Sequence, residues 1–415
     1  MNLTKATFAV LALAGSALLG ACQKETAAPV TPAEDNTPVV RPLTTQETRN
    51  VSSANDFAFR SFAALQAKAA NGNVFISPLS ISAALTMAYN GADGTTKEAM
   101  RQTLGFQPQT DEQISQAYQT LTELLRGMDK RVTFTAANSI WYAPQYELQA
   151  PFVQKNTTYF EAAVQPLDFS SAKAKDVING WVRDKTKGKI DGIIESLPPD
   201  QVMVLVNALY FKGTWTYPFD AKLTQKAPFK RADGSSASVD FMTLQKGSYH
   251  YYQDAAQQVI DLPYGNQQFS MTLVVPQGQT TVNDLARTIS STQLSSWLSS
   301  AKPTTLVLRL PKFKMEYKNS LNEMLITLGM GEAFSGQANF SRMLVGRTSG
   351  LAISDVLHKT YVEVNEEGTE AAAVTSVGII NTSVPPTVSV DRACLFMIRE
   401  KSTNAILFIG QLMNP

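Results

Sequence analysis

The sequence predicts an α+β fold with mainly antiparallel sheets. Helical patterns dominate the first half of the 415-residue chain and strand patterns the second half, with no internal repeat. Strands and helices do not alternate as they do in βαβ units, and separate helical and strand regions are typical of α+β proteins. A hydrophobic share of 44% can form a sizeable core. The net charge of +1, without a long basic run, gives no indication of nucleic acid binding.

The first 21 residues predict a signal peptide. Lys5 supplies a positive charge, and the apolar run 6–19 is too short for a comfortable transmembrane helix. The run ends in Leu19-Gly20-Ala21-Cys22, which resembles the box of bacterial lipoprotein signals and implies lipidation of Cys22 after cleavage before it. An ordinary secretory signal with a chance cysteine is the alternative. Gln23 after the cysteine favours the outer membrane, on its periplasmic or cell-surface face.

Residues 22–48 are rich in Pro, Thr and Ala and predict an extended tether. The folded domain is expected over residues 49–415. The second cysteine, Cys394, has no intrachain partner once Cys22 is lipidated, so no disulfide framework is expected. We interpret Cys394 as a small core residue rather than a reactive thiol.

Helices are expected where apolar residues recur at helical spacing. Ser77 can cap a helix whose first residue is Pro78. Asn319 is expected to cap a later helix that runs to Gly329. The other expected helices span 55–69, 111–125 and 174–185, with one more that begins near Thr96.

Strands are expected where apolar residues alternate or form short runs. The run 203–211 is almost wholly apolar, which predicts a central strand covered on both faces, with Asn207 as a polar exception. Residues 388–399 and 405–411 are expected to close the chain as a strand pair. The remaining expected strands are 73–76, 133–141, 259–264, 269–275, 305–310 and 354–365.

The segment 363–386 is the main functional signal in the chain. It is strand-like up to Gly368, and then small and uncharged residues continue as far as Pro385. With a period of two, one side of this segment carries no charge and could be buried as a strand, although a connecting loop is expected here. That side holds Thr369, Ala371, Ala373, Thr375, Val377 and Ile379.

Enzyme motifs are missing from the sequence. There are two histidines, His250 and His358, and no Gly-x-Ser-x-Gly elbow, phosphate loop, dinucleotide fingerprint or zinc-helix motif. Ser170-x-x-Lys173 and Ser299-x-x-Lys302 match a penicillin-binding pattern, but no Lys-Thr-Gly follows either of them. We therefore expect no catalytic activity, no cofactor and no metal.

Several motifs in order resemble those of the serpin family over nearly all of residues 50–415. The resemblance implies a fold of three mainly antiparallel sheets and about nine helices, with an exposed reactive-centre loop. The motifs are Asn73–Ser80, Asn207–Trp215, Leu262–Tyr264, Leu310–Phe313, Leu328–Met330, Phe340–Ser341, Asn365–Ala373, Leu407–Gly410 and Asn414–Pro415.

The resemblance also implies a suicide mechanism of protease inhibition. The target protease cleaves the loop and forms a covalent acyl complex, and the freed segment inserts into the central sheet as a new strand. Counting along the loop as in inhibitory relatives places the cleaved bond at Thr382–Ser383. Thr382 suits a small apolar specificity pocket, so elastase-like or subtilisin-like serine proteases are the expected targets, with cross-inhibition of a papain-like cysteine protease possible.

The resemblance assigns three groups of site residues. Ser77, Ser80, Asn207 and His358 match the shutter, a polar cluster beneath the central sheet that is alternatively a set of satisfied core groups. Trp215, Lys312 and Glu366 match the breach, where the loop first enters. The hinge comprises Glu366, Glu367, Gly368, Thr369, Glu370, Ala371, Ala372 and Ala373.

Two functions follow as expectations. The first is a monomeric protease inhibitor that is attached to the membrane through the lipid on Cys22. The second is a non-inhibitory serpin that acts as a binding or structural surface lipoprotein. The hinge pattern, with its small residues, favours the first.

Overall fold

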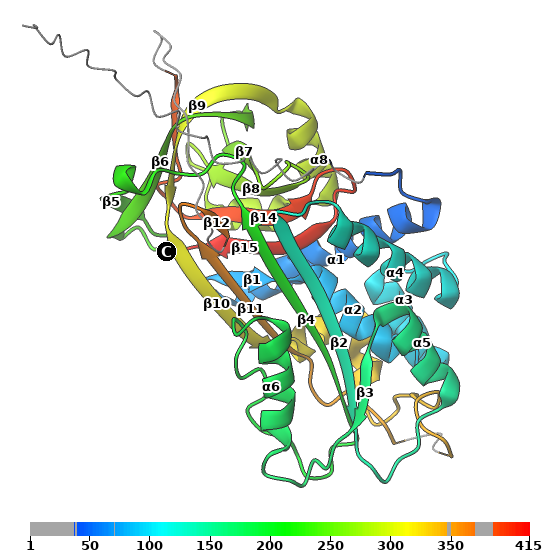
Figure 1. Cartoon of the computed structure of the whole chain (residues 1–415). Helices are drawn as coiled ribbons and strands as arrows, with labels where there is room; N and C mark the ends of the chain where they lie inside the picture. Colours follow the sequence, from blue (N-terminus) through cyan, green and yellow to red (C-terminus); the bar gives the residue numbers. More distant parts are fainter. Residues whose placement is uncertain (1–36, 38–39, 70, 347–349, 370–384) are drawn as a thin grey trace, which may run out of the picture. The chain divides into compact units, whose positions relative to one another are not determined.

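The structure is a computed structural model, and it describes residues 37, 40–69, 71–346, 350–369 and 385–415. All of these belong to the unit that spans Asn36–Pro415. The predicted α+β class is confirmed (Figure 1). The α-helices in these ranges are α1 (Thr45–Ala69), α2 (Pro78–Tyr89), α3 (Gly94–Leu104), α4 (Asp111–Gly127), α5 (Ala150–Phe160), α6 (Ala174–Lys185), α7 (Val282–Thr288), α8 (Ser291–Ser300) and α9 (Asn322–Leu325). Shorter helical turns are η1 (Ala221–Leu223), η2 (Ile326–Met330) and η3 (Gly331–Phe334).

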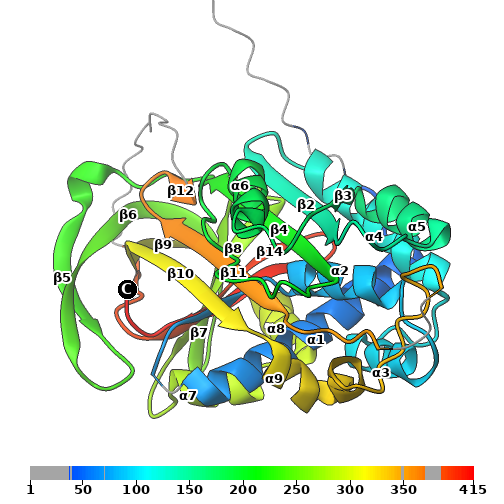
Figure 2. The same ribbon diagram turned by 90° about the horizontal axis from the view of Figure 1, so that it is seen from below.

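A six-stranded sheet carries most of the predicted site residues. Its strand order is β10-β11-β12-β4-β2-β3, and all neighbours are antiparallel except β2 and β3. Figures 1 and 2 show α6 lying against one face of this sheet. The strands are β10 (Phe313–Ser320), β11 (Leu357–Val364), β12 (Gly368–Thr369), β4 (Met203–Thr214), β2 (Val132–Tyr142) and β3 (Ala163–Pro166).

A nine-stranded sheet contains the remaining strands. Its order is β1-β15-β14-β8-β7-β6-β9-β13, with β5 also paired to β6. The strands are β1 (Val74–Ile76), β15 (Ile406–Leu412), β14 (Cys394–Glu400), β8 (Phe269–Pro276), β7 (Gln257–Pro263), β6 (Ser236–Gln253), β9 (Lys302–Pro311), β13 (Thr387–Ser389) and β5 (Gln225–Lys230).

Strand β6 explains why the described residues form two hydrogen-bonded sheets where the family resemblance implied three. It has 18 residues and pairs with β5, β7 and β9 along different parts of its length. Its pairing with β9 shifts register between Leu244 and Gly247 and then resumes. The continuous strand therefore joins two strand groups into one sheet.

The prediction of a central strand over 203–211 is confirmed by β4. On one face, Val206 and Ala208 pack with Ile178 and Val182 of α6. The helix α2 packs against β4 as well. Because both faces are covered, nearly every position of the strand can be apolar.

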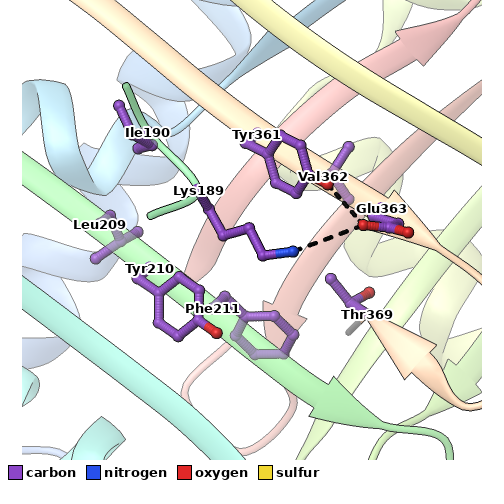
Figure 3. Close-up of a pocket in the computed structure, with 9 residues that line it drawn as sticks. All are labelled: Lys189, Ile190, Leu209, Tyr210, Phe211, Tyr361, Val362, Glu363 and Thr369. Carbon is purple, nitrogen blue, oxygen red and sulfur yellow. Dashed lines mark hydrogen bonds and ion pairs between the residues drawn. The ribbon is translucent and has the colours of Figure 1, made fainter. Parts of the chain in front are cut away.

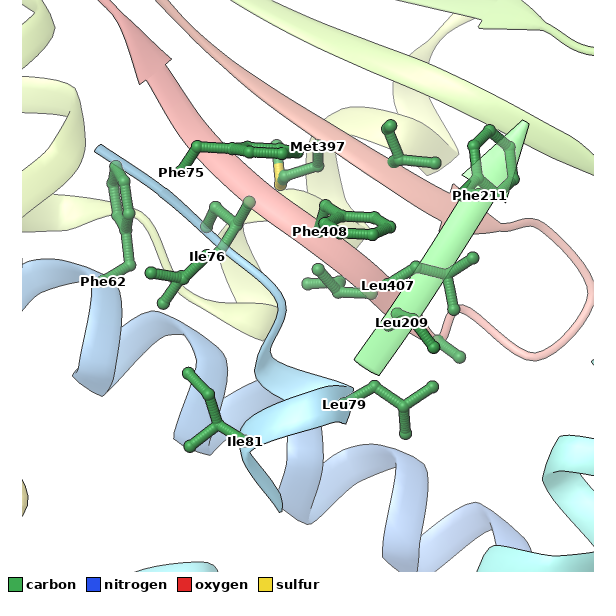
Figure 4. Close-up of a cluster of buried hydrophobic side chains, with 14 of the residues drawn as sticks. Phe62, Phe75, Ile76, Leu79, Ile81, Leu209, Phe211, Met397, Leu407 and Phe408 are labelled. Atoms are coloured by element: carbon green, nitrogen blue, oxygen red, sulfur yellow. The ribbon is translucent and has the colours of Figure 1, made fainter. Parts of the chain in front are cut away.

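The main core lies where β1, β14, β15, α2 and β4 meet (Figure 4). Phe75 of β1 stacks on Phe396 and Phe408, with ring centroids 5.4 and 5.2 Å apart. Cys394 is fully buried at the start of β14, and this burial raises the pKa of its thiol to about 12. The interpretation of Cys394 as a core residue is confirmed.

The first helix begins earlier than the predicted domain boundary, so residues 45–48 belong to α1 and not to the tether. Thr44 and Glu47 form a capping box, in which each backbone N–H donates to the other's side chain at 2.7 and 3.2 Å. Arg41 also donates two hydrogen bonds to the buried Glu47 carboxylate, at 2.7 and 2.5 Å. The hydrogen bonding of Arg41 to Glu47 is the largest of the causes that lower the pKa of the Glu47 carboxyl to about 2.

Two further strand and helix predictions are wrong. Asn319 does not cap a helix, because it lies in β10 opposite His358 of β11, and the helix α9 begins three residues later at Asn322. The expected strand 388–399 is two strands, since β13 pairs in parallel with β9 before β14 begins. In both places the pairing partner lies far away in the sequence, so the local sequence pattern could not predict the strand boundaries.

A buried ion pair crosses the nine-stranded sheet. Arg399 of β14 pairs with Asp261 of β7 at 3.0 Å, and both side chains are about 5% exposed or less. Thr272 of β8 links them, since it accepts from Arg399 at 2.9 Å and donates to Asp261 at 2.6 Å. Removal of one partner would leave an uncompensated buried charge.

We therefore predict that Asp261→Ala lowers the free energy of unfolding by about 3–5 kcal/mol, measured by urea denaturation. The matched control is Arg287→Ala, which breaks an ion pair with Asp284 whose side chains are 66% and 44% exposed. This control should lose less than about 1 kcal/mol. Equal losses in the two variants would contradict the prediction.

Candidate functional site

The predicted hinge turns back and enters the six-stranded sheet. Gly368 and Thr369 form β12 between β11 and β4, with Thr369 opposite Val364 on one side and Gly213 on the other. Gly368 has φ of 150°, and a Cβ there would lie 2.1 Å from the carbonyl oxygen of Gly213. Only glycine fits at this position.

The turn that precedes β12 is held by three sets of bonds. Asn365 accepts through its side chain from the backbone N–H groups of Glu367 and Gly368, at 3.1 and 3.3 Å. The Trp215 indole donates to the Asn365 carbonyl at 2.9 Å, and the Trp215 backbone N–H donates to the Glu367 carbonyl at 2.8 Å. The Phe219 N–H donates to the Glu366 carbonyl at 2.9 Å.

The three predicted breach residues meet at this turn. Lys312 pairs with the Glu366 carboxylate at 2.9 Å, and Thr224 donates to the same carboxylate at 2.7 Å. Partial burial would raise the pKa of Glu366, but the hydrogen bonds from Lys312 and Thr224 outweigh it and hold the pKa below its ordinary value. Trp215 is bonded to the backbone on either side of Glu366, so all three residues act on one turn.

Thr369 faces the core, as the period-two pattern predicts for this position. Its side chain is 3% exposed, and its hydroxyl lies 2.8 Å from the hydroxyl of Tyr264. Tyr264 is fully buried and stacks on Trp215 with 4.4 Å between ring centroids. Burial raises the pKa of Tyr264 above its ordinary value. Sequence reasoning used Tyr264 only as part of a motif and missed it as a hinge partner.

Below β12, the two neighbouring strands do not pair with each other in the described part of the sheet. Strand β11 pairs with β10 and β12, and strand β4 pairs with β2 and β12. A cavity of about 640 Å³ lies at the lower end, lined by residues of β4, β11 and α2 that include Leu205, Asn207, His358 and Ser80. We call this space between β4 and β11 the slot.

The upper part of the slot is lined by three neighbouring elements (Figure 3). Leu209, Tyr210 and Phe211 come from β4, and Tyr361, Val362 and Glu363 come from β11. Lys189, from the segment after α6, points across the opening, with its Nζ 3.8 Å from the Glu363 carboxylate.

The four predicted shutter residues are joined by hydrogen bonds, and three of them, Ser80, Asn207 and His358, line the lower cavity. The Ser77 N–H donates to His358 Nε2 at 3.0 Å, and the Ser77 hydroxyl donates to the Leu407 carbonyl at 2.8 Å. The Ser80 hydroxyl donates to the Asn207 side-chain oxygen, and the Ser80 N–H donates to the Ser77 hydroxyl at 3.3 Å. The predicted cap is also confirmed, because Ser77 is the N-cap of α2 and Pro78 is its first residue.

Asn138 belongs to this polar cluster and was missed. It lies opposite Asn207 in the β2–β4 pairing and accepts from the Asn207 amide at 2.6 Å. Its own amide donates to the Phe160 carbonyl at 2.6 Å. A polar residue inside the predicted strand 133–141 was the available signal, since a buried amide requires partners.

His358 is held in its neutral form. Burial lowers its pKa to about 3. Nε2 accepts a hydrogen bond from the Ser77 N–H, so this nitrogen carries no proton.

Several predicted site residues lie outside the described residues. They are the reactive bond Thr382–Ser383, the hinge residues Glu370, Ala371, Ala372 and Ala373, and the lipidation residue Cys22. Within the described ranges, no helix is long and apolar enough to cross a membrane. No cluster of three or more His, Cys, Asp or Glu side chains suited to a metal ion occurs in those ranges.

The fold is that of an α+β protein. Its six-stranded sheet has an unfilled strand position between β4 and β11, and the two-residue strand β12 lies at the start of that position. The family profile for serpins (serine protease inhibitors) matches residues 52–415. The chain therefore belongs to the serpin family.

Relatives and solved structures agree with this assignment. The chain is 35% identical to Iripin-2 of Ixodes ricinus, over 88% of this chain and 94% of that protein. It is 33% identical to the leukocyte elastase inhibitor of Xenopus laevis, over 88% of this chain and 100% of that protein. Human thyroxine-binding globulin complexed with thyroxine superposes with a TM-score of 0.82 at 30% identity, over 89% and 99% of the two chains. The thermophilic serpin tengpin in its native state gives a TM-score of 0.80 at 31% identity, over 92% and 97%.

The neutral His358 predicts a pH dependence of stability. Its pKa is about 3 when folded and ~6.5 when unfolded, so the unfolded chain binds the additional proton between these values. The free energy of unfolding should therefore fall as the pH is lowered from ~6.5, by ~1.4 kcal/mol per pH unit. Melting temperatures between about pH 5 and 6.5, where few carboxylates titrate, should show this slope.

The matched variants are His358→Gln, which should remove the slope, and His250→Gln at an exposed position, which should keep it. The Gln side chain retains an acceptor for the Ser77 N–H. An identical pH dependence in all three proteins would show that His358 is not responsible.

Proposed function

We propose that this protein is a suicide inhibitor of serine endopeptidases, in which loop cleavage is followed by insertion of the freed segment into the slot. The observation that carries the proposal is the pairing of β12 with both β4 and β11. Beyond β12, β4 and β11 are not paired with each other in the described part of the sheet. The inserted segment would supply the missing strand.

The register of β12 supports this proposal. If the strand continues from Thr369 without a shift, Thr375 falls opposite His358 on β11 and Asn207 on β4. These two residues are the shutter members on either side of the slot, so the Thr375 hydroxyl would meet polar partners. Ala371 and Ala373 would fall opposite Phe211 and Leu209 of β4, where a small side chain avoids conflict with a large one.

The energetics also support insertion. Each inserted residue can add hydrogen bonds with a net contribution of about 1 kcal/mol. Burial of Val377 and Ile379 would contribute roughly 1.5–3 kcal/mol each. The uncleaved form would then be held by a barrier and not by equilibrium.

The target class follows from the proposed reactive bond. Thr382 is a β-branched residue of moderate size, which suits the small apolar pockets of elastase-like and subtilisin-like proteases. No Lys or Arg lies near it in the sequence, so trypsin-like proteases are disfavoured. Cross-inhibition of papain-like cysteine proteases is a second part of the proposal.

We also propose that the domain is attached to a bacterial outer membrane by a lipid on Cys22. The sequence signal before Cys22 and the Pro-rich segment after it support this localisation. The tether would end near Arg41, because the capping box and the Arg41–Glu47 ion pair fix the chain from that point. Incorporation of a labelled fatty acid that Cys22→Ser abolishes would test it.

The first prediction is a covalent complex. When the full chain is mixed with pancreatic elastase or subtilisin, a band at the summed mass of inhibitor and protease should survive a denaturing gel. Papain tests the cysteine protease arm. Cleavage of the loop without such a band for any of these proteases would reject the inhibitor and favour the non-inhibitory alternative.

The second prediction concerns Thr369. Thr369→Arg places a long charged side chain at a position that is 3% exposed and bonded to Tyr264, so β12 should not extend. The variant should still be cleaved by elastase, but it should lose the covalent band. Thr369→Ser keeps the hydroxyl and should retain complex formation, and an active Arg variant would contradict the hinge argument.

A further inference from the structure

The lower cavity has a wall of apolar side chains that come from three parts of the chain. They are Ile81, Ala84, Leu85 and Ala88 of α2, Leu205 of β4, and Phe340 and Met343. The four residues of α2 recur at helical spacing, so one face of this helix forms a continuous side of the cavity. A volume of about 640 Å³ lies within the usual range for small-molecule sites.

A hydrogen-bond donor without a partner faces this cavity from His358. The side chain is 5% exposed, and its Nε2 accepts from the Ser77 N–H, so the proton of the neutral ring is on Nδ1. No residue that the structure describes accepts a hydrogen bond from Nδ1. This atom is also not sealed from solvent, unlike the buried and unpartnered Ser270 hydroxyl. Because His358 lines the cavity, the free donor opens into it.

The polar side chains beside this donor are already bonded. The Ser80 hydroxyl donates to the Asn207 side-chain oxygen, and the Asn207 amide donates to Asn138 at 2.6 Å. Among the lining residues of β11 and β4, His358 and Asn207 lie nearest to β12. The cavity therefore has a polar upper end with one free side-chain donor and an apolar wall below it.

The charges around the cavity disfavour an anionic ligand. The exposed carboxylates of Asp200 and Asp355 lie at its rim, and none of the described residues that line it is Lys or Arg. Burial lowers the pKa of His358 to about 3, so the ring offers no positive charge at neutral pH. A buried carboxylate would have no charge partner here, and burial of an unpaired charge is costly.

We propose that the lower cavity binds a neutral long-chain acyl amide, whose carbonyl oxygen accepts from His358 Nδ1 and whose acyl chain lies along the α2 wall. The carbonyl takes the place of water on the free donor and keeps its hydrogen bond. The amide N–H has acceptors as well, because the edges of β4 and β11 are not paired with each other in the described part of the sheet.

Such a ligand competes with strand insertion, and this second role rests on the proposed inhibitory function. A strand that continues in the register of β12 places Thr375 opposite His358. The ligand and the inserted strand then require the same space and the same donor. Bound ligand slows insertion and gives the protease more time to complete hydrolysis of the loop.

The first experiment measures binding in the uncleaved full chain and does not depend on inhibition. Decanamide should bind in calorimetry with a dissociation constant in the micromolar range. Decanoate, which is anionic, should bind at least about tenfold more weakly. Butanamide, which has a shorter acyl chain, should bind at least about a hundredfold more weakly. Absence of decanamide binding, or equal affinity for either comparison compound, overturns the site.

The histidine resonances test the position of the head group. In protein labelled with nitrogen-15 at histidine, decanamide should shift the Nδ1 resonance of His358 and leave that of the exposed His250 in place. A His358 resonance that stays unchanged at saturation overturns the assignment of the donor.

A variant with a filled cavity tests the position of the acyl chain. Ala84→Leu adds bulk to the α2 wall and should weaken decanamide binding at least about tenfold. The matched control is Ala67→Leu at an exposed position of α1, which should bind like the wild type. Equal binding by all three proteins overturns the site. If Ala84→Leu does not fold, the comparison of decanamide with butanamide in the wild type decides.

The last experiment measures the competition with insertion. Saturating decanamide should slow formation of the covalent complex with elastase and raise the fraction of cleaved, uncomplexed inhibitor. Unchanged rates at saturation overturn the regulatory role but not the site. If the wild type forms no covalent complex in the absence of decanamide, the proposed function fails, and calorimetry alone decides whether the cavity binds the amide.

Discussion

The close approach of β12 to β4 is the constraint on which the rest of the site depends. A Cβ at Gly368 would lie 2.1 Å from the Gly213 carbonyl oxygen, and a Cβ at Gly213 would lie 2.9 Å from the Tyr264 ring. Because both positions are glycine, the two backbones pair and Thr369 reaches the Tyr264 hydroxyl. The Asn365 side chain accepts a hydrogen bond within the turn, and the Trp215 indole donates one to the Asn365 carbonyl. These bonds hold the turn that leads into β12.

The N-terminal end of α2 contacts both strands that border the slot. Ser77, the N-cap of α2, binds His358 on β11, and Ser80 in the first turn binds Asn207 on β4. The two edges of the slot are therefore positioned by residues three apart on one rigid turn. The bond between the Ser80 N–H and the Ser77 hydroxyl ties these contacts together. A change at one edge must be transmitted through α2 to the other.

Sequence alone predicted the parts of this site that depend on local chemistry. The Ser77–Pro78 cap and the inward side chain of Thr369 follow from backbone geometry and from the period of a strand. The parts that were missed depend on partners distant in the sequence. Asn319 looks like a helix cap until β11 pairs with it. Tyr264 becomes a hinge partner only through its stacking on Trp215 and its hydrogen bond with Thr369, which are both distant in the sequence. The same reason explains why β6 was not foreseen as a continuous strand.

The two-residue strand also determines where the proposed insertion meets its barrier. Starting a strand between two others requires that several residues be ordered before bonds compensate for the loss of entropy. Here β12 already pairs on both sides, so each further residue would extend an existing ladder. The cost of the proposed insertion would then lie in the contacts that the new strand disturbs, namely the bonds of Ser77 to His358 and of Ser80 to Asn207. The proposed insertion would therefore start quickly, and its rate would be limited by the breaking of these contacts.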